Sequence, residues 1–510
     1  MRSLVSRTAT IAGAIVAAAC VYDAPLTPTG NTITAANVSN TSAAQLAGTV
    51  SRGPTSSSAS NRYVVLFRAG SAASAAVSAE VQKTGGLLEG AYDDPGFAVI
   101  SGVSNDAVGR LASINGVADV LPDVEFTLES SSTTESLGTD DAGIASAESP
   151  QTATQFARQW GMRAIQADAA WARGALGSPE VSVAILDTGI DYQWPDLDGR
   201  VDLTRSISLR PDEDARLVTW FGSAVNPISD LNGHGTLVSS IVSSNSGRFA
   251  GVTTRTTLFG VKVCIVFNSC STGAILNGIV YAVNHGADVI NMSLGGAFPK
   301  SAFPGFVSLI NRVFDYANKN GTLIVVAAGN EGSDLDHNGN IYATYCNSPH
   351  VVCVSATGPT GAATGVGPFI NPDAIAPYTN FGRSAISLAA PGGGVTTINA
   401  FVWGPCSQTA LAWHQPPRPT PTSPLPPPVI DGPLCPRSLG LFRLGGAGTS
   451  FSSPHVAGVA ASVIASTGRQ SPSQVRAILR NTSDDLGQPG TDPFYGKGRV
   501  NAARAVGAIP

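Results

Sequence analysis

One stretch near the C-terminus, residues 448–464, most constrains how this chain can fold. It begins Gly-Thr-Ser-Phe-Ser-Ser-Pro-His and continues with Ala, Gly, Ser, Val and one Ile. Small side chains on every side of a helix allow neighbouring elements to pack closely, which predicts a buried helix. Pro454 fits the first turn of that helix, because no helical hydrogen bond needs its missing N–H there. Ser450 is then expected at the helix N-terminus, beside unpaired N–H groups and the positive end of the helix dipole.

A serine at a helix N-terminus is more often a capping residue than a nucleophile, but two upstream stretches favour chemistry. Residues 181–191 contain an apolar run that ends in Asp187-Thr-Gly. This pattern predicts a buried parallel strand that carries Asp187 to the carboxyl edge of a sheet, where open α/β sheets bind ligands. His234 lies between two glycines in Asn-Gly-His-Gly-Thr, just before a helical pattern. The chain therefore presents an acid, a histidine and a serine in that order.

These three motifs resemble those of subtilisin-like serine peptidases, including the proteinase K-type branch, and subtilisin has the same Asp, His, Ser order. The resemblance implies a serine endopeptidase that hydrolyses peptide bonds through an acyl-enzyme, with Asp187, His234 and Ser450 as its catalytic triad. Asn330 follows the apolar run 323–329 and matches the asparagine that donates to the oxyanion in this family. Two further segments match substrate-binding positions, namely Ser293, Leu294, Gly295 and Gly296, and Ala327, Ala328 and Gly329.

The chemistry that this resemblance implies needs no cofactor, but a structural calcium ion is a further expectation. Asp196 matches a calcium-ligand position of the family, although the loop 244–251 is shorter than the calcium-site loop of the subtilisins proper. Asp334, Asp336 and Asn338 alternate oxygen ligands before a glycine, like the start of a calcium loop, but no glutamate follows at the usual place. Calcium binding and a solvated acidic turn are equal alternatives here.

The N-terminus has the features of an export signal. Residues 1–19 place two arginines ahead of an apolar run that is too short to span a bilayer. Cys20 directly follows three alanines and resembles a bacterial lipoprotein site, so we prefer lipidation of Cys20 over simple signal cleavage. Residues 20–61 are rich in Thr, Ser, Ala and Asn, which predicts a flexible tether. The protein is expected to be exported, either extracellular or as a lipoprotein of the cell surface or outer membrane.

The other six cysteines fall into three locally spaced pairs, and an exported chain meets an oxidising compartment. Spacing favours a connectivity without proving it. We expect three disulfides: Cys264–Cys270, Cys346–Cys353 and Cys406–Cys435.

Residues 62–126 show a β-α-β-β-α-β pattern, which suits a small ferredoxin-like α+β domain. Its size and position resemble the inhibitory, folding-assisting propeptide of subtilisin-like enzymes, and an unrelated adaptor domain is the alternative. Residues 127–155 are acidic and rich in Ser and Thr, which predicts a disordered linker open to proteolysis. We expect the maturation cleavage of a self-processing zymogen within this linker or at its start.

Residues 156–510 alternate apolar strand patterns with helical ones, which predicts an α/β catalytic domain with a mostly parallel sheet covered by helices on both faces. An insertion, residues 403–444, interrupts the approach to Ser450. Its proline-rich part, residues 416–428, favours extended polyproline conformation and cannot join a sheet. The insertion shapes access of the primed side of a substrate, or it is a solvated surface loop.

Charge and motif content exclude several other functions. The chain has 30 Lys and Arg against 35 Asp and Glu, with no basic stripe of the kind that nucleic acid requires. An aspartic peptidase needs a second Asp-Thr-Gly loop, which this chain lacks. An α/β-hydrolase needs Gly-x-Ser-x-Gly, and the Ser450 motif has a serine in place of the second glycine. The expected partners of a monomer are protein or peptide substrates and its own propeptide, with a membrane only through a lipid on Cys20. The alternative is a catalytically silent, subtilisin-like surface protein that binds peptides.

Overall fold

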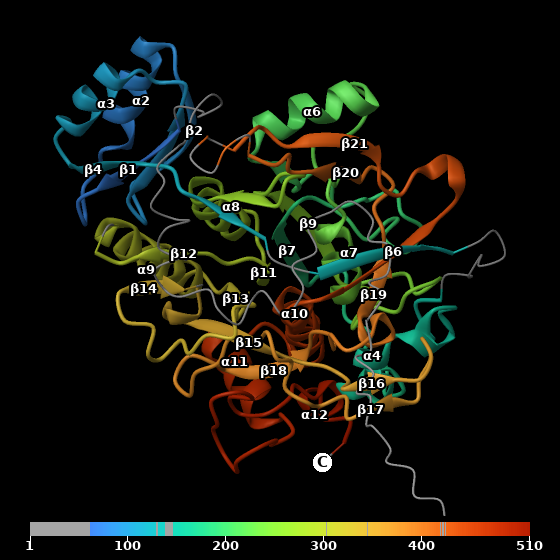
Figure 1. The fold of residues 1–510 in the computed structure, drawn as a ribbon. Coiled ribbons are helices and arrows are strands. Elements are labelled where there is room, and N and C mark those ends of the chain that lie inside the picture. Colours follow the sequence, from blue (N-terminus) through green and yellow to red (C-terminus); the bar gives the residue numbers. More distant parts are fainter. Residues whose placement is uncertain are drawn as a thin grey trace, which may run out of the picture.

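A computed structural model describes residues 62–128, 131–137, 146–301, 303–343, 345–418, 420, 423 and 425–509. Its largest sheet has seven strands, and neighbouring strands in it run parallel. This confirms the mostly parallel sheet predicted from the sequence (Figure 1). In spatial order the strands are β18 (Leu388–Pro391), β15 (Val351–Thr357), β13 (Leu323–Ala327), β11 (Val289–Met292), β7 (Ser182–Asp187), β9 (Thr257–Lys262) and β8 (Ile207–Ser208).

Helices cover both faces of this sheet, as the alternation of side chains along β7 makes plain. Val183 and Ile185 belong to one core, and Ala184 and Leu186 belong to a second core on the opposite face. The first core contains residues of α7 (His234–Val242) and α10 (Thr449–Thr467), and the second contains residues of α8 (Thr272–Asn284) and α9 (Pro304–Lys319). Further helices are α4 (Trp160–Ala164), α5 (Ala167–Trp171), α6 (Pro211–Phe221), α11 (Pro472–Asn481) and α12 (Ala502–Ala505).

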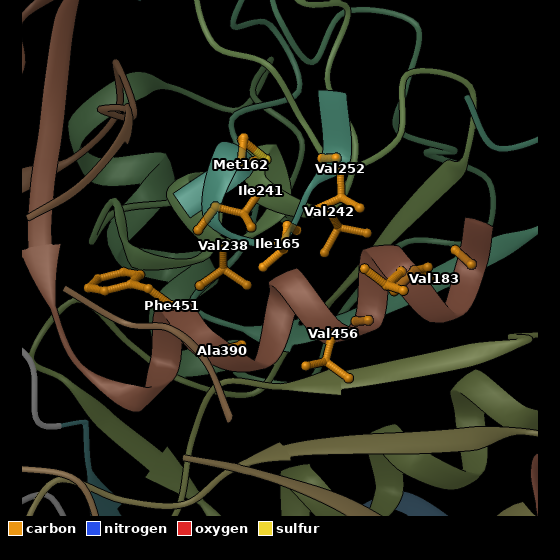
Figure 2. Close-up of a cluster of buried hydrophobic side chains, with 14 of the residues drawn as sticks. Met162, Ile165, Val183, Val238, Ile241, Val242, Val252, Ala390, Phe451 and Val456 are labelled. Carbon is orange, nitrogen blue, oxygen red and sulfur yellow. The ribbon is translucent and has the colours of Figure 1, made fainter. Parts of the chain in front are cut away.

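Helix α10 is the buried helix that its composition predicts. Its side chains are buried from Thr449 to Ile464, and Figure 2 shows its Phe451 and Val456 in one apolar cluster with Val238 of α7. The position expected for Pro454 is wrong, however. Because α10 already begins at Thr449, Pro454 lies in the second turn, where a helical N–H would normally bond back to the carbonyl of residue 450.

The small N-terminal domain has the β-α-β-β-α-β order that its sequence pattern predicts. Its antiparallel sheet, ordered β2-β3-β1-β4, carries its own core on one face, under α2 and α3. On the other face, Val64 and Val99 join the core of α8 and α9, and Figure 1 shows this blue domain beside those helices. The elements are β1 (Tyr63–Phe67), α2 (Ser74–Thr84), β2 (Leu87–Tyr92), β3 (Phe97–Ser101), α3 (Asn105–Ala112) and β4 (Val117–Pro122).

The segment that follows contains strands, which corrects the expectation of a disordered linker over residues 127–155. Strand β5 (Glu125–Thr127) pairs antiparallel with β10 (Ser269–Ser271), and β6 (Ser131–Ser136) pairs antiparallel with β22 (Phe442–Ala447). A 3-10 turn follows at Pro150–Thr152. The Ser- and Thr-rich composition did not reveal β6, because its ladder is made by backbone groups on an edge that lies far away in the sequence.

The insertion is also more structured than a surface loop. Its ends form β19 (Val402–Pro405) and β22, which pair with each other, and its middle forms an antiparallel pair of β20 (Leu411–His414) and β21 (Val429–Pro433). The described residues between β20 and β21 belong to no strand, in agreement with their proline content. Short strands elsewhere are β12 (Ala297–Pro299), β14 (Ile341–Ala343), β16 (Gly361–Ala362) and β17 (Phe369–Ile370).

The three disulfides expected from cysteine spacing are present: Cys264–Cys270, Cys346–Cys353 and Cys406–Cys435. The predicted signal peptide, the tether and Cys20 lie outside the described residues. Within the described part of the chain, no helix has the length and apolar character needed to cross a membrane.

Candidate active site

The structure brings Asp187 and His234 together. Asp187 ends β7, and His234 opens α7 directly after Gly233, whose φ of 101° favours glycine. The His234 Nδ1 donates to Asp187 Oδ1 at 2.7 Å, and both side chains are buried. Gly235 is required by close approach, since a Cβ there would lie 2.2 Å from the carbonyl oxygen of Gly189. The two glycines around the histidine thus serve a turn and a contact.

The environment of His234 favours a general base held in one orientation. Burial lowers the pKa of His234, but the charge and hydrogen bond of Asp187 outweigh it, so that the pKa lies above its ordinary value. The Nε2 atom has no hydrogen-bond partner among the described residues. With Nδ1 committed to Asp187, Nε2 is the nitrogen that can accept a proton.

Ser450 is the second residue of α10, and its two oxygens both contact Ser293, just after β11. The Ser293 hydroxyl donates to the Ser450 carbonyl at 2.6 Å, and Ser450 Oγ donates to the Ser293 carbonyl at 3.1 Å. The first of these bonds explains the place of Pro454. Because Pro454 has no N–H, the Ser450 carbonyl lacks its helical donor and accepts from Ser293 instead.

The hydroxyl of Ser450 therefore does not bond to His234, whose Nε2 has no hydrogen-bond partner among the described residues. The ring of Phe451, the next residue, lies against the His234 ring with centroids 5.6 Å apart, and α7 packs against α10. Rotation of the Ser450 side chain about χ1 would release its hydroxyl from the Ser293 carbonyl and let it donate to another acceptor. A long serine–histidine contact is common before a substrate completes such a site.

Asn330 is held by the residue before Ser450. Its Oδ1 accepts from the backbone N–H of Thr449 at 2.8 Å and from the Thr449 hydroxyl at 3.0 Å. The same hydroxyl accepts from the N–H of Gly329 at 3.0 Å. Because the oxygen end of the amide is fixed on Thr449, its NH₂ end is turned away from Thr449, as an oxyanion donor must be.

The two segments predicted to bind substrate lie at the ends of neighbouring strands. Ser293 to Gly296 follow β11, and Ala327 to Gly329 end and follow β13, which pairs with β11. The chain's own Phe126 already occupies part of this region. Its ring would be 2.0 Å from a Cβ on Gly296, and it stacks on Phe298 with centroids 6.1 Å apart. Gly296 thus makes room for a large apolar side chain.

Asp230 is a residue that motif reading missed. It is fully buried, and its carboxylate holds the loop that carries the histidine. Oδ1 accepts from the Thr188 hydroxyl at 2.8 Å and from the N–H of Gly233 at 2.9 Å, while Oδ2 accepts from the Thr236 hydroxyl at 2.6 Å. The sequence feature that could have indicated this role is an Asp two residues before Asn-Gly, a spacing typical of an Asx turn.

The base of the insertion is bonded to this same loop. The hydroxyls of Ser407 and Thr409 donate to the Asp230 carbonyl at 2.7 and 2.8 Å, and the N–H of Gln408 donates to Asp191 Oδ2 at 2.8 Å. Cys406 and Cys435 are buried beside it. The alternative of a solvated surface loop is therefore wrong for the base of the insertion.

The residues proposed for calcium do not form cation sites. Both carboxylate oxygens of the buried Asp196 accept backbone N–H groups, from Arg248 at 2.9 Å and Phe249 at 3.0 Å. This is a fit for N–H donors and not for a cation, and burial raises the pKa of Asp196.

The second candidate set is dispersed among protein partners. Asp334 accepts from His337, Asp336 accepts from Ser384, and Asn338 accepts from Lys300. Over the described ranges, no group of three or more His, Cys, Asp or Glu side chains could hold a metal ion. Neither set fits calcium, and we derive no step through a metal.

Comparison with known proteins agrees with this geometry. The family model described as the subtilase family, peptidase S8, matches residues 178–498. Thermitase from Thermoactinomyces vulgaris is 31% identical over 353 residues, covering 68% of this chain and 96% of thermitase. Subtilisin E from Bacillus subtilis is 29% identical over 371 residues, covering 72% of this chain and 76% of that protein. The solved structure of a mutant of the epidermin leader peptide processing serine protease from Staphylococcus aureus shares the fold with a TM-score of 0.62 and 20% identity, covering 89% of this chain and all of that one. This chain belongs to the subtilase family.

Proposed function

We propose that this protein is an exported serine endopeptidase made as a self-processing zymogen. One observation carries the proposal: a single stretch of the chain pairs with two separate strands of the catalytic domain, and one of these strands leads directly into Ser450. In the first pairing β5 lies on β10, and the N–H of Leu128 donates to the Asn268 carbonyl at 2.7 Å. In the second pairing Ser131 lies opposite Ala447, three residues before Ser450. Only residues 129 and 130 join these two points.

Adding a strand to an exposed edge is a common way to bind an extended peptide, and here the added strand β6 begins opposite Ala447, close to Ser450. We therefore place the self-cleavage between Leu128 and Ser131. Phe126 would fill the apolar pocket before the cleaved bond, against Gly296 and Phe298. This location falls at the start of the segment in which the sequence predicts maturation.

In the proposed reaction His234 Nε2 accepts the proton of Ser450 Oγ as that oxygen attacks the scissile carbonyl carbon. The Asn330 amide and the backbone N–H of Ser450, near the start of α10, donate to the oxyanion. The C–N bond breaks as His234 returns the proton to the leaving nitrogen. Water then hydrolyses the acyl-enzyme by the same proton transfers, and Asp187 stabilises the imidazolium each time.

The small domain is proposed as the inhibitory, folding-assisting propeptide, and its contacts with α8 support this. Asp123 accepts from the N–H of Gly273 at 2.8 Å and from the Ser271 hydroxyl at 2.5 Å, at the N-terminus of α8. Tyr92 donates to Asn277 Oδ1 at 2.5 Å, one turn further on. These bonds hold the end of the small domain against the start of α8, directly after β10, the strand with which β5 pairs.

The test compares the full chain with its Ser450→Ala variant in a host that lacks other proteases. The wild type should yield two fragments whose new N-terminus, read by mass spectrometry, lies at residue 129, 130 or 131, and Ser450→Ala should stay intact. A serine-directed fluorophosphonate should label the wild type alone. No labelling and no cleavage in correctly folded wild type would favour the silent, peptide-binding alternative.

Export, the lipid on Cys20, a monomeric state and the proteinase K-type branch complete the proposal. The first two rest on the N-terminal sequence, and the branch rests on the motifs with the short loop 244–251. Mass spectrometry of the membrane and secreted fractions tests the first two together. A lipid-modified Cys20 in the membrane fraction supports the tether, and an unmodified chain found only in the medium contradicts it.

A further inference from the structure

The ladder between β6 and β22 extends well beyond the residues that flank Ser450. Six residue pairs join the two strands, from Ser131 opposite Ala447 to Ser136 opposite Phe442. Strand β22 is the middle strand of a three-stranded sheet, with β19 of the insertion on its other side. When β6 leaves, β22 becomes an edge strand, and an exposed edge is a template for another extended chain.

One side chain on β22 is built to contact an acid. Arg443 lies opposite Glu135, and both its Nε, at 3.0 Å, and its Nη2 donate to Glu135 Oε2. The guanidinium lies 5.1 Å above the ring of Trp403 on β19, and Nη1 donates to Gln155 Oε1 at 2.8 Å. Arg443 is 8% exposed and Trp403 is 1% exposed. The contact with Trp403 does not depend on β6, so it favours this orientation of Arg443 before a peptide arrives and reduces the entropy lost on binding.

A second cation makes this place favourable for an anion. The positive charge of Arg443 contributes to lowering the pKa of Arg158, after burial, whereas Glu135 raises it. Two guanidinium groups thus share the field of one carboxylate. Removal of that carboxylate leaves Arg443 and Arg158 with uncompensated repulsion in a partly desolvated place.

We propose that β22 is a primed-side docking strand and that its Arg443 selects substrates with Asp or Glu at the position that Glu135 occupies. Because the cleaved bond lies between residues 128 and 131, this acid is the fifth to seventh residue after it. The occupant is an extended polypeptide with an acidic side chain, and β6 of the zymogen is its intramolecular counterpart. The inference rests on the proposed protease function and assigns a role to the insertion, which supplies most of β19 and half of β22.

The experiment uses the self-processed enzyme and three peptides with the same non-primed residues and a primed side of eight residues. A first scan places Glu at the fifth, sixth or seventh residue after the cleaved bond and finds the position that the wild type prefers. The three peptides then carry Glu, Gln or Lys at that position. If mass spectrometry finds residues 131–136 still on the mature enzyme, a Glu135→Gln background weakens their competition. The wild type should cleave the Glu peptide with a kcat/KM about 10-fold or more above the Gln peptide, mainly through KM.

In Arg443→Gln the Glu-to-Gln ratio should fall to about one, and Arg443→Glu should favour the Lys peptide. Arg437→Gln, an exposed arginine of the same insertion, should keep the wild-type ratio. Equal rates for the three peptides at all three positions in the wild type would overturn the inference, even if the variants do not fold. A short peptide without primed residues separates the protease proposal from the Arg443 proposal, because Arg443 cannot contact it. If the wild type does not cleave this peptide, the protease function itself is overturned.

Discussion

Ser293 and Ser450 hold each other by a reciprocal pair of hydrogen bonds, from the Ser293 hydroxyl to the Ser450 carbonyl at 2.6 Å and from the Ser450 hydroxyl to the Ser293 carbonyl at 3.1 Å. Ser293 also contacts the Ser453 hydroxyl at 2.9 Å and accepts from Asn291 Nδ2 at 2.9 Å. These contacts tie the end of β11 to the first turn of α10. Ser450 and the segment that begins at Ser293, which are the proposed nucleophile and a proposed substrate-binding segment, therefore form one bonded unit.

Ser293→Ala should weaken this unit, because the Ser450 carbonyl would keep neither its helical donor nor its side-chain donor. We expect a loss of about 1–3 kcal/mol in the free energy of unfolding and a lower kcat for the active enzyme. Urea unfolding in a Ser450→Ala background, which avoids autolysis, measures the first, and peptide hydrolysis measures the second. Ser462→Ala is the control and should not change kcat, because Ser462 is in the same helix as Ser450 but its hydroxyl contacts only the distant Ala175 carbonyl, at 3.4 Å. An unchanged free energy of unfolding in Ser293→Ala would refute the idea that the Ser293 hydroxyl replaces the N–H that Pro454 lacks.

The pH dependence of activity should reflect the raised pKa of His234. A protonated imidazole cannot accept the Ser450 proton, so kcat should rise with pH through an inflection above the ordinary histidine pKa of about 6.5. The contribution of His234 to the free energy of unfolding changes with pH in the opposite direction. The charged His234–Asp187 pair stabilises the fold fully below that ordinary value, and this contribution is lost as pH rises through the raised pKa.

Asp187→Asn removes the group that raises the pKa, so that burial dominates and the inflection moves to lower pH. The kcat should also fall by about 10⁴-fold, the size known for the equivalent change in a Ser-His-Asp protease of another fold. His337→Gln is the control, because the pKa of His337 is also raised by an aspartate, Asp334, but on the surface. An inflection that moves with His337 and not with Asp187 would contradict the assignment of His234 as the base.

Asp230→Asn tests the residue that sequence reasoning missed. An asparagine has one acceptor oxygen, and its NH₂ would face either the N–H groups of Asn232 and Gly233 or the N–H and the hydroxyl of Thr236. We expect a loss of about 3 kcal/mol in the free energy of unfolding, because several donors to a buried carboxylate lose their acceptor. Asp202→Asn is matched, since Asp202 accepts from Thr204 and Arg205 but lies nearer the surface, and it should cost less than half as much. Equal losses in the free energy of unfolding for the two variants would contradict the role of Asp230 in holding the loop of His234.

The sequence predicted those parts of the fold and site that depend on local pattern. The apolar run before Asp187, the glycines around His234 and the small residues after Ser450 each impose a local geometry that the structure contains. The parts that it did not predict depend on distant partners. Strand β6 has no apolar alternation, because backbone groups of β22 hold it. Pro454 could not be placed in its turn without knowing that Ser293 supplies the missing donor.

The last prediction concerns the insertion, whose base and tip should behave differently. The base bonds to the loop of His234 through Ser407, Thr409 and Leu411, the last of which donates to the Leu231 carbonyl at 2.8 Å and belongs to a buried apolar cluster. Deleting residues 407–434 should therefore reduce hydrolysis even of a short peptide by about 10-fold or more, since the loop that carries His234, the proposed general base, loses its support. Replacing only residues 415–428 with Asn-Gly should spare this activity, because His414 already lies opposite Val429 and a two-residue turn can join them. Both variants are assayed with a short chromogenic peptide, and thermal unfolding confirms that each is folded. Equal activity of the larger deletion and the wild type would show that the insertion does not support His234, whereas loss of activity in the smaller replacement would show that the proline-rich tip takes part in the site.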